Sequence, residues 1–266
     1  ELMTRAIDDN APFNAEEIRE SLDLCLSCKA CKNECPSSVD MAALKAEAMY
    51  QYYNEKGFDL RTKFFGKFDQ YATWASFLPK LTNALLNNPW FQRNLKKQLC
   101  IAPDRSIPHF NKKRTSQIHN PSSKKCPDFV LYIDEFSEFQ DGDIVRAAVE
   151  LLNRLGYSFS MVYAPSGRAA FSKSMLEHAE KSANKVLDKL KQYLDKDLPI
   201  VGIEPSAILG FRDEYHKLRL NRKDEIEKLS RQAFTLEEFL FSEVEKGVLN
   251  GKFFNDEKEA VHIHMH

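Results

Sequence analysis

Residues 128–163, DFVLYIDEFSEFQDGDIVRAAVELLNRLGYSFSMVY, decide the fold of this chain. The apolar stretch DFVLYIDEF at 128–136 predicts a strand. GDIVRAAVELLNRL at 142–155 has the spacing of an amphipathic helix and is followed by Gly156 as a stop. YSFSMVY at 157–163 predicts a second strand. A strand, a helix and a strand in this order predict two parallel strands joined by a right-handed crossover.

The alternation continues beyond this unit. A long helix is expected over about 172–195, and LPIVGIEP at 198–205 predicts a buried apolar strand. The remaining elements are three helices and a final strand, expected at 206–218, 223–232, 235–246 and 260–266. The third of these helices opens with a capping-box sequence, T-L-E-E. The pattern predicts an α/β domain built on a parallel sheet.

The earlier part of the chain has a different sequence pattern, because apolar residues recur at helical spacing over most of residues 12–118. Asp40 is a suitable N-cap for the helix that follows it, and Gly57 is a suitable stop for the same helix. Pro79 and Pro89 divide the later part into short helices. These signals predict a small, wholly helical domain.

An aromatic stripe follows the second of these helices. Its members recur at spacings of three and four residues and are Phe64, Phe65, Phe68, Tyr71, Trp74, Phe77 and Leu78. Because periodic aromatic residues usually pack inward, we expect the stripe to form the core of the helical domain. Contact with a membrane surface or with a quinone is the alternative.

Two domains follow from this division of the chain. Residues 103–127 contain four prolines among polar residues, which indicates a linker. We therefore predict the fold class α + α/β, with a helical domain over 1–118 followed by the parallel-sheet domain over 119–266. The chain starts without Met and ends in an alternating run, so we expect a segment of a longer polypeptide, truncated at its C-terminus.

Composition narrows the class of protein. The chain has 38 basic and 39 acidic residues and a net charge of -1, which argues against a nucleic-acid partner. No apolar run approaches the roughly 20 residues that span a bilayer. The first ten residues, ELMTRAIDDN, lack the apolar stretch of a secretory signal. We therefore expect a cytoplasmic protein, with peripheral attachment at the inner membrane face left open.

The strongest motif is CLSCKACKNECP at 25–36, which holds four of the six cysteines. The intervals of two, two and three residues before Cys-Pro are typical of a [4Fe–4S] cluster, and the four candidate ligands are Cys25, Cys28, Cys31 and Cys35. Three thiolates in one tight turn can reach three irons. The fourth, held by the proline, points away and in two-cluster ferredoxins ligates the other cluster.

Two other uses of these cysteines fit the sequence less well. A structural zinc site pairs Cys-x-x-Cys knuckles across a longer segment, and a disulfide needs an oxidising compartment. Lys29 and Lys32 flank the ligands and are expected to be solvated, although a positive charge there could favour the reduced cluster. Cys100 and Cys126 have no partner at ligand spacing, so we expect packed or free thiols.

A second candidate site lies where the predicted parallel strands end. Ligands gather at the carboxyl edge of open α/β sheets, and the polar or flexible residues expected there are Asp134, Ser166, Gly167, Arg168, Glu204 and Ser206. Arg168 could hold an anion, whereas capping of the next helix is the commoner role for such residues. His262, His264 and His266 alternate along the last strand and are either metal ligands or ordinary strand residues.

The run CLSCKACKNECPSSVDMAALKAEAMYQYY at 25–53, together with CIAPDRSIPHF at 100–110, resembles a known arrangement. It is similar to the iron–sulfur half of FAD-linked D-2-hydroxyacid dehydrogenases, the large D-lactate, glycolate and D-2-hydroxyglutarate oxidoreductases. In that family a FAD-binding oxidase region precedes a helical ferredoxin-like domain and a cysteine-rich α/β domain. The resemblance continues more faintly through the predicted α/β domain.

The resemblance assigns roles to the cysteines. Cys25, Cys28 and Cys31 would hold three irons of one cluster, and Cys35 would ligate a second cluster whose other cysteines lie upstream. The family often carries a Cys-Cys-Gly motif where this chain has 165–167, Pro-Ser-Gly. Asp134 and Ala207 stand where further family cysteines occur, and no cysteine follows Cys126, so this domain lacks the ligands for a cluster of its own.

These features predict an iron–sulfur electron-transfer segment of a FAD-linked oxidoreductase. A flavin domain, upstream or on a separate subunit, would oxidise a D-2-hydroxyacid and pass electrons through the cluster to a downstream acceptor. The chain itself offers no base or nucleophile for that oxidation. The alternatives are an iron–sulfur subunit of a heterodisulfide-reductase-like or anaerobic glycerol-3-phosphate dehydrogenase complex, and a non-catalytic interaction module.

Overall fold

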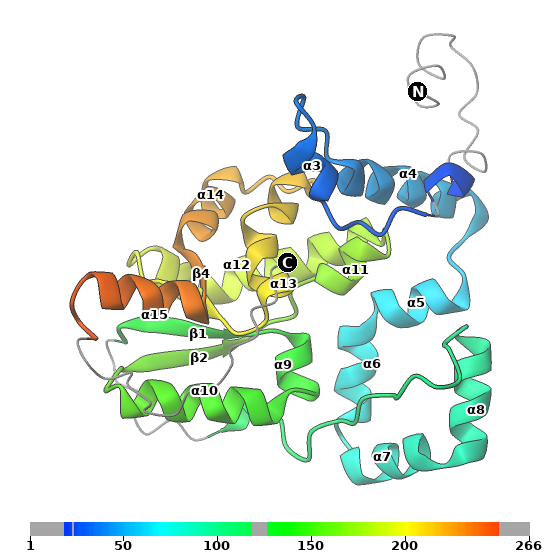
Figure 1. Ribbon diagram of the computed structural model, residues 1–266, viewed down its shortest axis with the longest axis horizontal. Helices are drawn as coiled ribbons and strands as arrows, with labels where there is room; N and C mark the ends of the chain where they lie inside the picture. Colours follow the sequence, from blue (N-terminus) through cyan, green and yellow to red (C-terminus); the bar gives the residue numbers. More distant parts are fainter. Residues whose placement is uncertain (1–18, 23, 119–126, 250–266) are drawn as a thin grey trace.

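The computed structural model describes residues 19–22, 24–118 and 127–249 (Figure 1). Residues 19–22 are helical. The helices of the first half are α3 (Ala30–Glu34), α4 (Met41–Lys56), α5 (Leu60–Gly66), α6 (Phe68–Ala75), α7 (Pro79–Asn87) and α8 (Pro89–Gln98), followed by the 3₁₀ turn η1 (Thr115–Gln117). The expected N-cap and stop of α4 are confirmed, because the Asp40 side chain accepts the Ala43 N–H and Gly57 has φ 81°. Proline occupies the first position of α7 and of α8.

The second half is an α/β unit. Its strands are β1 (Phe129–Ile133), β2 (Phe159–Tyr163), β3 (Ile200–Gly202) and β4 (Ala233–Thr235). Its helices are α9 (Glu135–Phe139), α10 (Gly142–Arg154), α11 (Arg168–Ser172), α12 (Leu176–Leu194), α13 (Pro205–Ile208), α14 (Lys223–Gln232) and α15 (Leu236–Glu245), with the 3₁₀ turns η2 (Leu209–Phe211) and η3 (Glu214–Lys217). The sheet order is β2-β1-β3-β4 and every described pair is parallel, as predicted.

The sheet is buried on both faces. One face packs on α11, α12, α14 and the segment around η2, through a core that includes Tyr132, Leu187 and Phe211. The other face packs on α10 and α15, with Phe129 in contact with Phe239. In Figure 1 the layers are visible as α12 and α14 above the strands and α10 below them. Burial on both faces explains why β1 is a continuous apolar run instead of an alternating one.

Several predicted boundaries were wrong, each for a local reason. The strand expected at 128–136 ends at Ile133, because the Asp134 carboxylate accepts the N–H groups of Phe136 and Ser137 and starts α9. The helix expected at 172–195 is preceded by α11, and Ser174, with φ 56°, separates the two. The helix expected at 206–218 is α13 followed by two 3₁₀ turns, and β4 was not predicted.

The aromatic stripe does not form the core that we expected. Trp74, Phe77 and Leu78 are more than 60% exposed. Phe64, Phe65 and Phe68 are half-buried: they contact other aromatic rings and also line a cavity, so they are not enclosed as core residues. Among the described residues, the first half buries a few large side chains, such as Leu86 and Leu99, together with small residues such as Ala42, Ala46 and Ala72.

The first half packs against the α/β unit at several points. Asn111 donates its backbone N–H to the Phe139 carbonyl at 2.7 Å, and the buried Thr115 hydroxyl lies 2.9 Å from the Glu138 carboxylate. Asp69 on α6 pairs with His178 on α12 at 2.8 Å. The middle of the predicted linker is therefore anchored on α9. In Figure 1 the helices α5 and α6 lie beside α9 and α11, next to the carboxyl ends of the strands.

Candidate metal centre

The cysteine loop, residues 25–35, is short and sharply turned. Ser27 and Lys29 have left-handed backbones, with φ 56° and 63°, which reverse the chain within a few residues. The Cys35 N–H donates to the Cys31 carbonyl at 2.9 Å and closes the short helix α3. These turns keep four thiols within eleven residues of backbone.

Lys45 anchors the start of this loop. Its ammonium group on α4 donates to the carbonyl oxygens of Leu22 and Cys25 at 2.8 and 2.6 Å. Both acceptors belong to the chain that leads into the loop. The anchor fixes the position of the first cysteine relative to α4, and it does so through backbone atoms, leaving the Cys25 thiol available.

The opposite side of the loop is held by an acidic clamp, which consists of Asp213 and Glu214 on the α/β unit. Lys29 donates to a carboxylate oxygen of each acid, both at 2.6 Å. Lys32 donates to Asp213 at 3.1 Å. The expectation that the two loop lysines are simply solvated is therefore wrong. They join the cysteine loop to a segment more than 180 residues away along the chain.

Lys217 is a third lysine that pairs with the acidic clamp. It contacts Asp213 at 2.7 Å and also pairs with Asp40, the residue that caps α4. Burial opposes the charge on Asp213, but hydrogen bonds from Lys217, Lys29 and Lys32 outweigh burial and hold the pKa of Asp213 well below its usual range. The Asp213 carboxylate is therefore charged at neutral pH. It joins Lys29 and Lys32 of the cysteine loop to Lys217.

The thiols have the chemistry that an iron–sulfur site requires. Cys28 and Cys31 are exposed, Cys25 and Cys35 are half-buried, and none of the four is in a disulfide. The backbone N–H groups of Val39, Ser37 and Ser38 lower the pKa of Cys35 against the smaller opposing effect of burial. A lowered pKa favours the thiolate, which is the form that binds metal.

Four thiols are the donors that a [4Fe–4S] cluster takes, but their side chains do not point to one common position in the structure. Among the described residues no three Cys, His, Asp or Glu side chains are grouped around a common metal position. Cys100 is exposed and follows α8, outside the loop. Cys126 and the three histidines of the expected last strand, His262, His264 and His266, lie outside the described residues.

Two of the candidate residues at the sheet edge, Asp134 and Glu204, accept hydrogen bonds from nearby backbone N–H groups. Asp134 caps α9, and its carboxylate also accepts the Ser137 hydroxyl at 2.6 Å. Glu204 caps α13 and accepts the Ser206 hydroxyl at 2.6 Å. Both carboxylates therefore carry out the capping role that was the alternative to ligand binding. A ligand role for these residues stays a prediction.

A buried carboxylate that the sequence had not singled out lies beside them. Glu135 accepts the Ser166 N–H at 2.7 Å and the Ser166 hydroxyl at 2.9 Å. Burial, followed by the negative charge of Asp134, raises the pKa of Glu135 to about 7. Arg168, the predicted anion-binding residue, instead lies 3.6 Å from Glu214 of the acidic clamp. The sheet edge and the cysteine loop are thus joined through Glu214.

Gly167 has a structural role that can be measured. It has φ 77°, and an added Cβ would lie 3.1 Å from the Ala179 carbonyl oxygen on α12. We expect Gly167→Ala to destabilise the fold more than Gly57→Ala, where φ is 81° and the space is open. Gly57→Ala should lower the free energy of unfolding by about 1–2 kcal/mol because of its left-handed backbone, and Gly167→Ala should lower it by at least about 1 kcal/mol more. Equal losses in urea unfolding would contradict a close approach of α12.

Sequence reasoning found the cysteine loop but missed the residues that hold it. Asp213, Glu214 and Lys217 lie in a stretch expected to be an ordinary helix. The pattern DEYHK at 213–217 has no motif that links it to a cysteine loop. The one available signal was the pair of lysines inside the loop, because two cations near thiolates call for acidic partners.

The chain is similar to part of several much larger dehydrogenases. It is 26% identical over 222 residues to "D-2-hydroxyglutarate dehydrogenase" of Escherichia coli, which is 79% of this chain and 22% of that protein. It is also 26% identical over 217 residues to the protein of that name from Pantoea ananatis, and 22% identical over 239 residues to the one from Haemophilus influenzae. The chain spans about a fifth of the length of these relatives.

No family model and no solved structure matches the chain. Within the residues that the structure describes, none of the helices combines the length and the apolar character needed to cross a membrane.

Proposed function

We propose that this chain is the iron–sulfur electron-transfer segment of a FAD-linked dehydrogenase that oxidises a D-2-hydroxyacid, with D-2-hydroxyglutarate as the first substrate to test. The observation that carries the proposal is the cysteine loop, with four free thiols held between Lys45 and the acidic clamp. The similarity to D-2-hydroxyglutarate dehydrogenases supports the choice of substrate class. The flavin would belong to a FAD-binding oxidase domain, and the electrons would leave to a downstream acceptor.

The residues of this chain would divide the work as follows. Cys25, Cys28 and Cys31 would hold three irons of a [4Fe–4S] cluster, and Cys35 would ligate a second one. When bound, a cluster supplies one-electron transfer, and the protein supplies ligation, insulation and tuning. Lys45 and the acidic clamp would keep the ligand loop in place against the α/β unit, and Lys29 would place a positive charge, neutralised by its acidic partners, beside the thiolates.

Anaerobic reconstitution with iron and sulfide tests the proposal. We expect bound iron and sulfide, a broad absorption band near roughly 400 nm and an EPR signal on reduction, as for thiolate-ligated cubanes. Cys28→Ser should abolish most of the iron binding, whereas Cys100→Ser should leave it unchanged because Cys100 lies outside the loop at 25–35. Stoichiometric zinc without iron would reject the cluster.

The ligand division has its own test. If Cys35 serves a second cluster, Cys35→Ser should retain the iron that Cys25, Cys28 and Cys31 bind. A cubane that is lost in Cys35→Ser as completely as in Cys28→Ser would show that all four thiols bind one cluster, and the proposed division would be wrong.

A further inference from the structure

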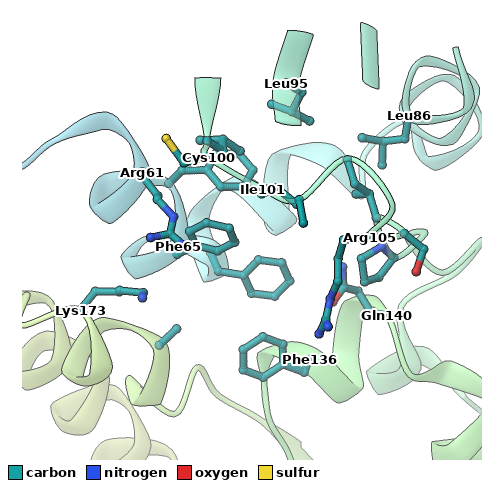
Figure 2. Close-up of a pocket in the computed structure, with 18 of the residues that line it drawn as sticks. Arg61, Phe65, Leu86, Leu95, Cys100, Ile101, Arg105, Phe136, Gln140 and Lys173 are labelled. Carbon is teal, nitrogen blue, oxygen red and sulfur yellow. The ribbon is translucent and has the colours of Figure 1, made fainter. Parts of the chain in front are cut away.

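A large cavity lies between the first half of the chain and the α/β unit (Figure 2). We call it the interface cavity. Its volume is about 1030 Å³, and its walls come from α5, α6, α8, the segment 100–110, α9 and α11. Small-molecule sites in proteins typically enclose about 300–1,000 Å³. The interface cavity is therefore large enough for a multi-ring ligand, and it lies apart from the four candidate iron ligands.

Aromatic rings form the body of this cavity. Phe68 from α6 stacks on Phe136 from α9, with ring centroids 4.9 Å apart and ring planes 12° apart. Phe64 and Phe65 from α5 meet edge to face at 5.5 Å. Figure 2 shows Phe65 and Phe136 facing the same open space from opposite halves of the chain. Flat apolar walls of this kind favour a flat ring, because offset stacking adds to the burial of apolar area.

Two cations flank the Phe65 ring. The Arg61 guanidinium carbon and the Lys173 ammonium nitrogen each lie 5.9 Å from its centroid. Among the described residues, neither cation has a carboxylate within salt-bridge distance, although Asp104 also lines the cavity. Burial lowers the pKa of Lys173, the positive charges of Arg61 and Lys45 lower it further, and the negative charge of Asp59 opposes this shift without cancelling it. Arg61 and Lys173 therefore place positive charge at the wall of the cavity, and a bound anion would stabilise the charged form of Lys173.

We propose that the interface cavity binds a small molecule that has a flat aromatic ring system and an anionic group, with the ring against the aromatic wall formed by Phe65, Phe68 and Phe136 and the anion between Arg61 and Lys173. Apolar walls alone would accept any hydrophobic molecule, and the cations alone would accept any anion. Their combination around one ring selects molecules that have both features. The site does not depend on the cysteine loop, so its failure would leave the iron–sulfur proposal standing.

Calorimetric titration of the 266-residue chain with 2-naphthoate tests this site. Naphthalene-2-methanol keeps the ring without the charge, and hexanoate keeps the charge without the ring. We expect 2-naphthoate to bind at least about tenfold more tightly than either. Naphthalene-2-methanol lacks the charge-assisted hydrogen bond, which contributes about that factor, and hexanoate lacks the ring that stacks on the aromatic wall. Arg61→Gln and Lys173→Gln should each weaken 2-naphthoate about fivefold or more and leave naphthalene-2-methanol unchanged.

Arg93→Gln is the matched control, because Arg93 is an exposed arginine on α8 that does not line the cavity. Thermal unfolding of each variant shows whether it is folded. Cys100 gives a second measurement, since it is exposed and lines the cavity. Bound 2-naphthoate should slow alkylation of Cys100 and leave Cys28 unaffected. No binding of 2-naphthoate, equal binding of hexanoate or naphthalene-2-methanol, or equal weakening by Arg93→Gln would overturn the proposal.

Discussion

Glu135→Gln is expected to stabilise the protein by on the order of 3 kcal/mol at pH 8, because the pKa of this carboxyl is raised from 4.5 to about 7 in the folded state. Its carboxylate is fully buried and receives two hydrogen bonds from Ser166, but among the described residues it has no cationic partner. A glutamine has the same shape. Its amide oxygen can accept the Ser166 N–H, and its amide nitrogen can donate to the Ser166 hydroxyl oxygen.

The sign of the pH dependence follows from the raised pKa. Below about pH 4.5 Glu135 is protonated in both the folded and the unfolded chain, so its contribution to stability is fully present. As the pH rises from 4.5 to about 7, the unfolded chain ionises first and stability is lost. Above pH 7 the loss is constant. The gain from Glu135→Gln should therefore be close to zero at pH 4.5 and largest above pH 7.

Urea unfolding at pH 4.5, 6 and 8 measures this difference. Burial also raises the pKa of Asp134 to about 6. The stability of the variant should therefore keep part of the wild-type pH dependence. Glu150→Gln serves as the control, because Glu150 is exposed on α10 and forms a surface ion pair with Arg154. A Glu135→Gln variant that is no more stable than wild type at pH 8 would show that the carboxylate is already protonated or hydrated in the folded protein.

The elements that the sequence predicted best are those in which burial and periodicity agree. β1 and α10 were found because a continuous apolar run and a helical stripe each stand out from their flanks. The capping box at Thr235 fixed the start of α15 to within a residue. β4 could not be predicted, because three residues are too short to show a period and pair with β3 only through the folded sheet.

The candidate site could likewise be predicted only in part. The thiols of the cysteine loop could be identified because iron–sulfur ligands are close together in sequence. The acidic clamp could not, because Lys29 and Asp213 are 184 positions apart and salt-bridge partners carry no spacing signal. The interface cavity also escaped prediction. Phe65 and Phe136 belong to different halves, and the packing of α5 on α11 and of α6 on α9 brings their walls together.

Asp213→Asn is expected to release the cysteine loop from the α/β unit. The substitution keeps the size of the side chain and removes the charge that Lys29, Lys32 and Lys217 share. Three ammonium groups would then face one another with Glu214 and Asp40 as the remaining partners. Since uncompensated charge in a partly buried network is costly, the loop should open locally and the global fold should persist.

Hydrogen exchange of the loop amides measures the opening. The N–H groups of Lys32 and Cys35 are hydrogen-bonded within the loop, and we expect Asp213→Asn to increase their exchange about tenfold or more, which corresponds to about 1.4 kcal/mol. Asp188→Asn removes an acid from an exposed ion pair of the same α/β unit and should leave both amides unchanged. After reconstitution, the released loop should also lose iron faster to a chelator. Unchanged exchange in Asp213→Asn would mean that Lys45 and the turns of the loop are sufficient to hold it, and that the clamp neutralises the lysines without positioning the ligands.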